Sequence, residues 1–272
     1  MVKTPCPSFC LTTSMSPSSD KDQKNAALLP YCTIIGKCMY LANCTWPDIS
    51  FSVQDLAKFM SNYGPKHFEA AKHLLHYLQG TCSRGLTYDK SPNLYPLFKV
   101  FTDSDWATFK NCKSISSYIV KCANSPLTWS SKQQVVVALS SCKAEYLACS
   151  HAAHQIAWLH SLFKELSFPQ LHPTLLYCNN QGMVACTHNP QSHSHMKHID
   201  IRAHFICDMV NKQLIDVHHI PGTKNPVDLL TKPLHCSTHL KWLVYISMHE
   251  DLPCNNSCPV PSRHGSWGGV NS

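Results

Sequence analysis

The stretch of sequence that decides the fold is LFKVFTDSDW, residues 97–106. Its β-type, largely apolar residues predict a short buried strand, and Asp103 stands where that strand ends. A carboxylate next to buried sequence is costly unless a cationic side chain or a metal ion meets it. The stretch therefore predicts both a central strand and a candidate functional group at its end.

The segments that follow this strand predict a mixed sheet covered by helices. The expected elements are, in order, strands at 114–123 and 126–131, a long helix from near Ser140, a strand at 174–180, two adjacent helices, a strand at 214–221 and a short helix at 226–232. Three antiparallel strands followed by helix-linked strands indicate an α/β fold with a mixed sheet.

The rest of the chain divides into four further segments. Three short amphipathic helices are expected between residues 30 and 84, where Pro47 and Pro65 each begin a helix. Residues 1–29 are rich in Ser, Thr, Pro and Lys without an apolar period, so we expect a flexible lead-in. A C-terminal helix over 236–248 and a disordered tail over 249–272 complete this division.

The composition excludes several classes of protein. Of 272 residues, 14% are charged, against about 25% in soluble domains, so a buried core is expected and disorder is not. No apolar run reaches the roughly 18 residues of a membrane helix, and no secretory signal core is visible, so we expect a cytoplasmic or nuclear protein without membrane association. The 16 cysteines contain no C-x-x-C pair, which argues against a zinc ribbon.

Three acidic residues lie at the edges of the expected elements: Asp103 ends a strand, Glu145 lies early in the long helix, and Asp228 begins the short helix. Two hard divalent cations need such a cluster of carboxylate oxygens, and a pair of them supports phosphodiester cleavage. The net charge of +7 suits a polyanionic partner.

Several longer sequence motifs add a family resemblance to this hypothesis. They are YCTIIGKCMYL (31–41), HFEAAKHLLHYLQGT (67–81), TDSDWA (102–107), VALSSCKAEY (137–146), YCNNQ (177–181), HSHMKHIDIRAHFI (193–206) and VDLLTKPL (227–234). From about Pro30 to Leu234 the chain resembles the C-terminal part of copia-type retrotransposon Pol polyproteins. The resemblance implies a helical remnant of the reverse transcriptase at 30–84, then a ribonuclease H-like domain at 85–235 with a mixed five-stranded sheet and flanking helices.

The resemblance also implies an activity and its cofactors. Family members cut the RNA strand of RNA–DNA hybrids with two Mg²⁺ or Mn²⁺ ions and need no small-molecule cofactor. The metal-binding acids match Asp103, Glu145 and Asp228, whereas Asn179 stands where the family has a fourth acid. The amide removes a negative charge beside two dications, so we expect weakened metal binding and an impaired endonuclease, with Asp105 or Asp200 as candidates for partial compensation.

Other departures from the family point toward a decayed copy of an element. No Y-x-D-D word occurs, so reverse transcriptase activity is not expected, and Ser117 replaces a family glycine, which predicts strain in the first hairpin. The alternative function is therefore an inactive nucleic-acid-binding remnant. The sequence leaves the oligomeric state open.

The histidine-rich word at 193–206 allows two interpretations. His193, His195 and His198 could hold zinc, although their spacing lacks the i, i+4 pair of a helical zinc site. A loop facing nucleic-acid phosphates through Lys197, His198 and Arg202 is the interpretation that we favour.

Overall fold

The computed structural model describes residues 2–88, 98–106, 112–188 and 200–250. Within them a five-stranded sheet has the order β4-β3-β2-β5-β6. Its strands are β2 (Phe98–Asp105), β3 (Ile115–Cys122), β4 (Ser125–Gln133), β5 (Thr174–Cys178) and β6 (Ile215–His219). The predicted mixed sheet with flanking helices is confirmed, and LFKVFTDSDW supplies its central strand.

The strand directions follow from the connections between the strands. β2, β3 and β4 pair antiparallel, while β5 lies parallel to β2 and to β6. Ala123 and Asn124 join β3 to β4 with φ angles of 50° and 61°. Two positive φ angles in a two-residue loop match the twist of antiparallel strands. The parallel strands are linked instead through helices, as parallel pairing requires.

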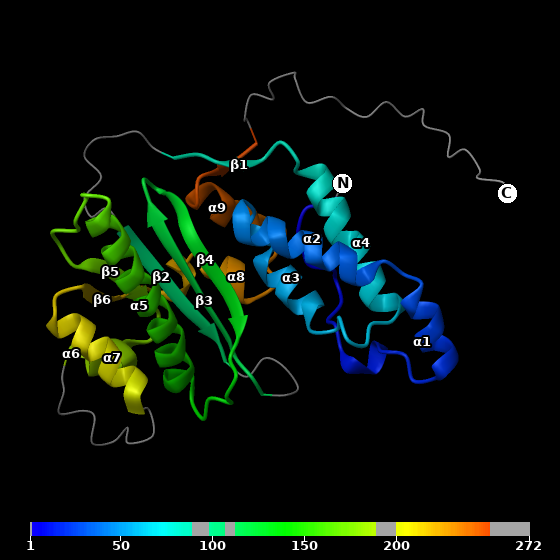
Figure 1. Cartoon of the computed structure of the whole chain (residues 1–272), viewed down its shortest axis with the longest axis horizontal. Coiled ribbons are helices and arrows are strands. Elements are labelled where there is room, and N and C mark those ends of the chain that lie inside the picture. The colour runs from blue at the N-terminus through cyan, green and yellow to red at the C-terminus, as the bar shows by residue number, and fades with distance from the viewer. Residues whose placement is uncertain (1, 89–97, 107–111, 189–199, 251–272) are drawn as a thin grey trace.

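One face of the sheet carries three helices, α5 (Ser141–Glu165), α6 (Gln181–His188) and α7 (Asp200–Asn211), which Figure 1 shows on the same side of the strands. The side chain of Ser140 caps α5 by accepting a hydrogen bond from the Lys143 N–H. The core of this face includes Phe98, Val100, Tyr146, Ile156 and Leu176. The long helix expected from near Ser140 is thus held by the sheet.

The opposite face is covered by α8 (Asp228–Thr231) and α9 (Cys236–Tyr245), preceded by the short 3-10 helix η4 (Gly222–Lys224). Phe101, Ile119, Leu230 and Trp242 form the centre of this second core. The C-terminal helix expected over 236–248 ends earlier, because Ser247 adopts a φ of 56°, which a helix does not tolerate. Met248–His249 form β7 instead, which pairs with β1 (Gly85–Leu86).

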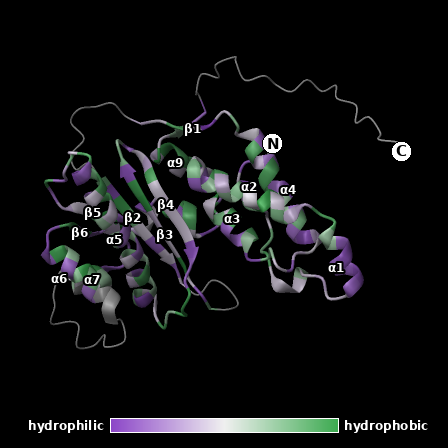
Figure 2. Cartoon of the chain, in the orientation of Figure 1, coloured by the Kyte–Doolittle hydropathy of each residue, from purple (hydrophilic) through white to green (hydrophobic). Residues whose placement is uncertain are grey.

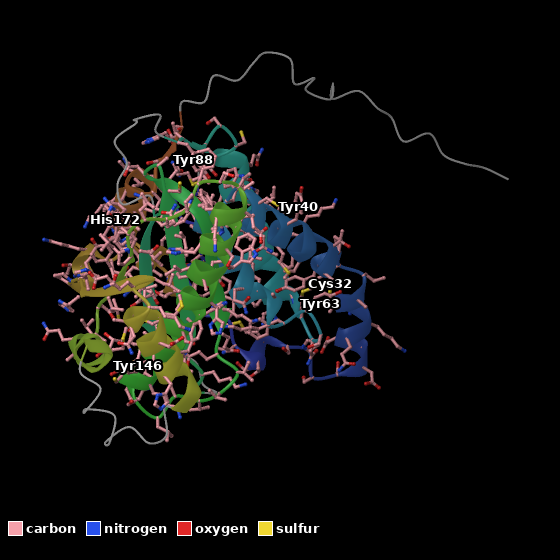
Figure 3. The ribbon with its side chains drawn as sticks, turned by 60° about the vertical axis from the view of Figure 1, so that its left-hand side comes forward. Cys32, Tyr40, Tyr63, Tyr88, Tyr146 and His172 are labelled. Atoms are coloured by element: carbon pink, nitrogen blue, oxygen red, sulfur yellow. The ribbon has the colours of Figure 1, made fainter. Side chains whose placement is uncertain are left out.

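A helical unit precedes the sheet. It contains α2 (Tyr31–Cys44), the 3-10 helix η2 (Pro47–Ile49), α3 (Ser50–Ala57) and α4 (Pro65–Gly80). Tyr63, labelled in Figure 3, stacks on Tyr31 with ring centroids 4.6 Å apart. Its hydroxyl donates a hydrogen bond to the Leu29 carbonyl. Trp129 Nε1 of β4 donates to the Ala42 carbonyl of α2 over 2.7 Å, so the unit is joined to the sheet.

Residues 2–29, expected as a flexible lead-in, contain the 3-10 helix η1 (Thr13–Met15) and α1 (Asp20–Ala27). The helix α1 is largely hydrophilic (Figure 2), so an apolar period could not reveal it, but Ser19 caps its first turn. The segment also contacts the helical unit, because the Thr4 carbonyl lies 3.0 Å from His73 Nε2 and Ser16 donates to the Asn62 carbonyl.

The end of the described chain is also held by contacts. Arg84 forms an ion pair with Glu250, and Tyr88 donates a hydrogen bond to the Pro126 carbonyl (Figure 3). The expected tail from 249 therefore begins with residues that the structure places, and residues 251–272 lie outside the described part. Cys38, Cys149 and Cys178 are buried thiols that form no disulfide. No helix there is long and apolar enough to cross a bilayer.

Candidate active site

The fold brings the four predicted site residues to one edge of the sheet. Asp103 lies near the end of β2, and Asn179 directly follows β5. Because these two strands run parallel, with Phe101 opposite Tyr177, their ends meet at the same edge. Glu145 in the second turn of α5 and Asp228 at the start of α8 reach this edge from the two faces of the sheet.

Asp103 is 3% exposed and both of its carboxylate oxygens accept hydrogen bonds. Asn179 Nδ2 donates to Oδ1 over 2.9 Å, and Thr231 Oγ1 donates to Oδ2 over 2.9 Å. Burial, followed by the negative charge of Asp228, raises the pKa of Asp103 to about 6. The carboxylate is thus enclosed by neutral donors.

Glu145 is 4% exposed and lies beside Asp103. Its Oε1 accepts a hydrogen bond of 3.4 Å from the Ser104 N–H, and the Cys178 thiol lies 3.7 Å from Oε2. Burial raises the pKa of Glu145 to about 10, with Cys178 and Asp103 adding to the effect. Burial thus favours the neutral form of this carboxyl group when no cation is bound.

Asp228 forms an ion pair with Lys232, with Oδ1 and Nζ 2.8 Å apart. Burial raises the pKa of Asp228, and the hydrogen bond from Lys232 opposes that rise. Asp105, the last residue of β2, is half-buried and repels the charges of Asp103 and Asp228. The structure therefore adds Asp105 to the group, whereas the side chain of Asp200 is not described.

The residue types suit a divalent cation, but their arrangement does not. Carboxylate and amide oxygens are the ligands that Mg²⁺ prefers. Asn179, however, turns its N–H₂ group to Asp103, and Asp228 is already paired with Lys232. Among the described residues no three His, Cys, Asp or Glu side chains are grouped as metal ligands. The arrangement of these side chains therefore does not support the binding of two metal ions, and the side chain of Asn179 is one cause.

Some residues of the site were not predicted from the sequence. Thr231 fixes Asp103, and Asn225 Nδ2 donates to the Thr102 carbonyl over 2.9 Å, which attaches the start of α8 to β2. Ser117 and Ser131 both donate to the Leu230 carbonyl, at 3.0 and 2.7 Å. Ser117 is not among the residues with positive φ, so the strain predicted from its missing glycine is absent. These contacts are long-range, and the only sequence signal for Thr231 is that it lies within the motif VDLLTKPL.

The predicted phosphate-facing loop lies mostly outside the described residues. Lys197 and His198 belong to the range 189–199, as do His193 and His195 of the zinc alternative. Arg202 is in α7, but its side chain is not described. The loop therefore stays a prediction.

Comparison with known proteins places the chain in a family. The retrovirus-related Pol polyprotein from transposon TNT 1-94 of Nicotiana tabacum is 35% identical over 223 residues, or 82% of this chain. The Pol polyprotein from transposon RE1 of Arabidopsis thaliana is 37% identical over 229 residues, again 82% of this chain. This chain belongs to the retrovirus-related Pol polyproteins of transposons.

The chain spans only 16% and 15% of the length of these two Pol polyproteins. No family model matches it. Among solved structures, LC11-RNase H1, isolated from compost, aligns with 47% of this chain and 86% of its own length, at 17% identity and a TM-score of 0.36. The order and directions of the five strands in this Pol segment agree with the RNase H-like fold that its sequence predicts.

Proposed function

We propose that this Pol segment is an RNase H-type endonuclease domain whose cleavage of the RNA strand in RNA–DNA hybrids is impaired. The domain covers residues 85–235, and residues 30–84 are a helical remnant of the reverse transcriptase. Three acids at one sheet edge, Asp103, Glu145 and Asp228, support this assignment through their mutual electrostatic interactions. Cleavage would depend on Mg²⁺ or Mn²⁺.

The hydrogen bond from Asn179 to Asp103 carries the proposal that the activity is impaired. A carboxylate at this position would repel Asp103 and favour a cation between the two side chains. The amide does the opposite, since its N–H₂ group satisfies Asp103 without a metal ion. Asn179 would therefore compete with a cation for Asp103 Oδ1.

A second candidate function is hybrid binding without cleavage. The observation that favours it is that each of the three acids already has an internal partner: Thr231 and Asn179 for Asp103, Ser104 for Glu145, and Lys232 for Asp228. These contacts stabilise the fold without a metal ion. The fold and its nucleic-acid surface could then persist while turnover is lost.

A cleavage assay separates the two functions. The purified chain is incubated with an RNA–DNA hybrid labelled on the RNA strand, with Mg²⁺ or with Mn²⁺, beside Asn179→Asp and the double variant Asn179→Asp, Asp103→Asn. We expect weak cleavage by the parent chain, an increase on the order of 10²-fold in Asn179→Asp, and none in the double variant. Cleavage only in Asn179→Asp supports the binding remnant for the natural chain.

Asn180 provides a matched control. It is adjacent and half-buried, and its Oδ1 accepts the Met183 N–H at the start of α6. Asn180→Asp adds the same charge and keeps this cap. If Asn180→Asp raises cleavage as much as Asn179→Asp, or if neither variant cuts, the assigned role of Asn179 is wrong.

A further inference from the structure

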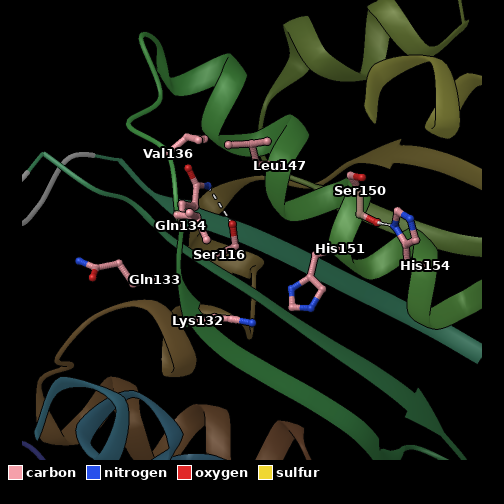
Figure 4. Close-up of a pocket in the computed structure, with 10 residues that line it drawn as sticks. Ser116, Lys132, Gln133, Gln134, Val136, Leu147, Ser150, His151 and His154 are labelled. Carbon is pink, nitrogen blue, oxygen red and sulfur yellow. Dashed lines mark hydrogen bonds between the residues drawn. The ribbon is translucent and has the colours of Figure 1, made fainter. Parts of the chain in front are cut away.

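A cavity of about 250 Å³ lies beside the candidate active site, between the sheet and α5. Figure 4 shows Ser116, Lys132 and Gln134 lining it from the sheet side, and His151 and His154 lining it from α5. Val136 and Leu147 close its apolar end. It thus combines the Lys132 cation and polar side chains of the sheet side with two histidines of α5, the helix that follows β4.

The charged groups of this cavity are all of one sign. No Asp or Glu lines it, and Lys132 is exposed and forms no ion pair within the described ranges. Burial lowers the pKa of His151, and the charges of Lys132 and His154 lower it further, so the three side chains lie within electrostatic reach of one another. A concave site with a lysine cation and no acid favours an anionic ligand.

The cavity also holds a buried polar atom without a partner. Gln134 is 7% exposed, and its Nε2 donates to Ser116 Oγ over 2.8 Å and to the Ala144 carbonyl over 3.0 Å. Its Oε1 has no hydrogen-bond partner in the part of the chain that the structure describes. This oxygen has less than 1 Å² of accessible surface, so it belongs to the interior of the cavity wall and does not itself contact a ligand. The Ser116 hydroxyl, which accepts from Gln134, keeps its own proton to donate.

Paired residues of the sheet connect the cavity lining to the candidate active site. Ser116 is the cross-strand partner of Ser104, whose N–H donates to Glu145, and Lys132 is the partner of Ser116 on the next strand. Paired residues share a face of the sheet, and adjacent strands are about 4.8 Å apart. Lys132 therefore lies about 10 Å, two strand spacings, from β2, the strand that carries Asp103.

We propose that this cavity binds a phosphate group of a nucleic-acid strand, with Lys132 and His151 contacting the phosphate oxygens. The distance from the candidate active site allows one strand to occupy both places. This inference rests on the proposed function only where it identifies the phosphate as part of a bound RNA–DNA hybrid. The cavity's chemistry, a cation, a hydroxyl donor and no acid, stands without it.

The first test measures hybrid binding in a chelating buffer, so that cleavage does not interfere. The dissociation constant of a labelled RNA–DNA hybrid is determined against salt concentration for the parent chain, Lys132→Gln and Lys164→Gln. Lys164 is exposed near the far end of α5 and is absent from the cavity lining, so its substitution removes the same charge elsewhere on the protein. We expect Lys132→Gln to weaken binding several-fold and to reduce the salt slope by about 1, with Lys164→Gln unchanged.

The second test distinguishes a nucleic-acid phosphate from free phosphate. Inorganic phosphate is titrated into the parent chain and Lys132→Gln while the His151 ring resonances, assigned with His151→Gln, are followed by NMR. The proposal predicts a response in the parent chain that is lost in Lys132→Gln. If the His151 resonances respond to inorganic phosphate but Lys132→Gln leaves the salt slope of hybrid binding unchanged, the nucleic acid is not the source of the phosphate. If the salt slopes are equal and the His151 resonances do not move, the cavity is not a phosphate site.

These outcomes are independent of the cleavage assay. A chain that binds hybrid through Lys132 but never cuts, even as Asn179→Asp, supports the cavity and contradicts the endonuclease. If Asn179→Asp cleaves the hybrid but Lys132→Gln leaves the salt slope of hybrid binding unchanged, the endonuclease is supported and the cavity is contradicted.

Discussion

The side-chain amide of Asn179 donates a 2.9 Å hydrogen bond to Oδ1 of Asp103, joining the ends of β5 and β2. A neutral donor thus takes the position next to a buried carboxylate where a second carboxylate would require a cation. The same contact explains how the site is stable without metal and why it suits metal poorly. The charge at residue 179 therefore has the largest influence on how well the site suits a metal ion.

Asn179→Asp should make the stability of the chain depend on metal. Without a cation, two adjacent carboxylates repel each other, and we expect the free energy of unfolding to fall by about 1 to 3 kcal/mol. A cation that binds only the folded state restores stability. Urea unfolding in EDTA and in Mg²⁺ measures both effects, with Asn180→Asp as the control. A variant as stable as the parent chain in EDTA would contradict this account of the contact.

Ser117→Ala combined with Ser131→Ala should loosen α8. Both hydroxyls donate to the Leu230 carbonyl, so their loss leaves a buried acceptor unpaired. We expect a loss of about 1 to 3 kcal/mol in urea unfolding, and less for either single variant, because one donor can replace the other. Additive single effects would show that the two serines do not share this acceptor in solution.

Trp129→Phe should weaken the connection between the sheet and the helical unit. The indole N–H donates to the Ala42 carbonyl over 2.7 Å, whereas the phenyl ring keeps much of the apolar contact. A loss of about 1 kcal/mol is expected. Hydrogen exchange should show faster opening near Ala42, while exchange in β5 and β6 stays as in the parent chain. Uniform acceleration across the sheet would mean that the bond serves the whole fold.

The Tyr77 hydroxyl joins two buried groups with opposite pH dependence. It donates to Asp48 and lies 3.0 Å from His239 Nε2. Burial raises the pKa of Asp48 to about 6, and burial lowers the pKa of His239 to about 4. Between these values the folded state keeps a proton on Asp48 that the unfolded chain releases, and it leaves His239 without a proton that the unfolded chain binds.

The sign of each contribution follows from this difference. From about pH 4 to 6 the contribution of Asp48 to stability falls as pH rises, while that of His239 increases, so they offset each other in the parent chain. Asp48→Asn should therefore make stability rise more steeply with pH in this range than in the parent chain, and His239→Gln should make it fall. Urea unfolding at several pH values checks both signs. Parallel profiles for all three chains would contradict the two shifts.

Local pattern was sufficient for much of the fold. The β-type run before Asp103, the alanine-rich stretch after Ser140 and the prolines at 47 and 65 predicted elements that the structure contains, because strand and helix periods are written in neighbouring residues. The pattern did not predict α1, which is largely hydrophilic, or the end of α9, where Ser247 turns the backbone.

The sequence by itself determined the order of strands and helices, the identity of the acids and the substitution at residue 179. Only the tertiary structure decided how these residues meet: which group of Asn179 faces Asp103, that Thr231 and Lys232 engage the acids, and that Lys132 and His151 share a cavity. The physical reason is the sequence separation between the residues that interact. Element type depends on residues a few positions apart, whereas each hydrogen bond to the Asp103 carboxylate joins residues more than 70 positions apart. Their approach depends on the packing of the whole sheet.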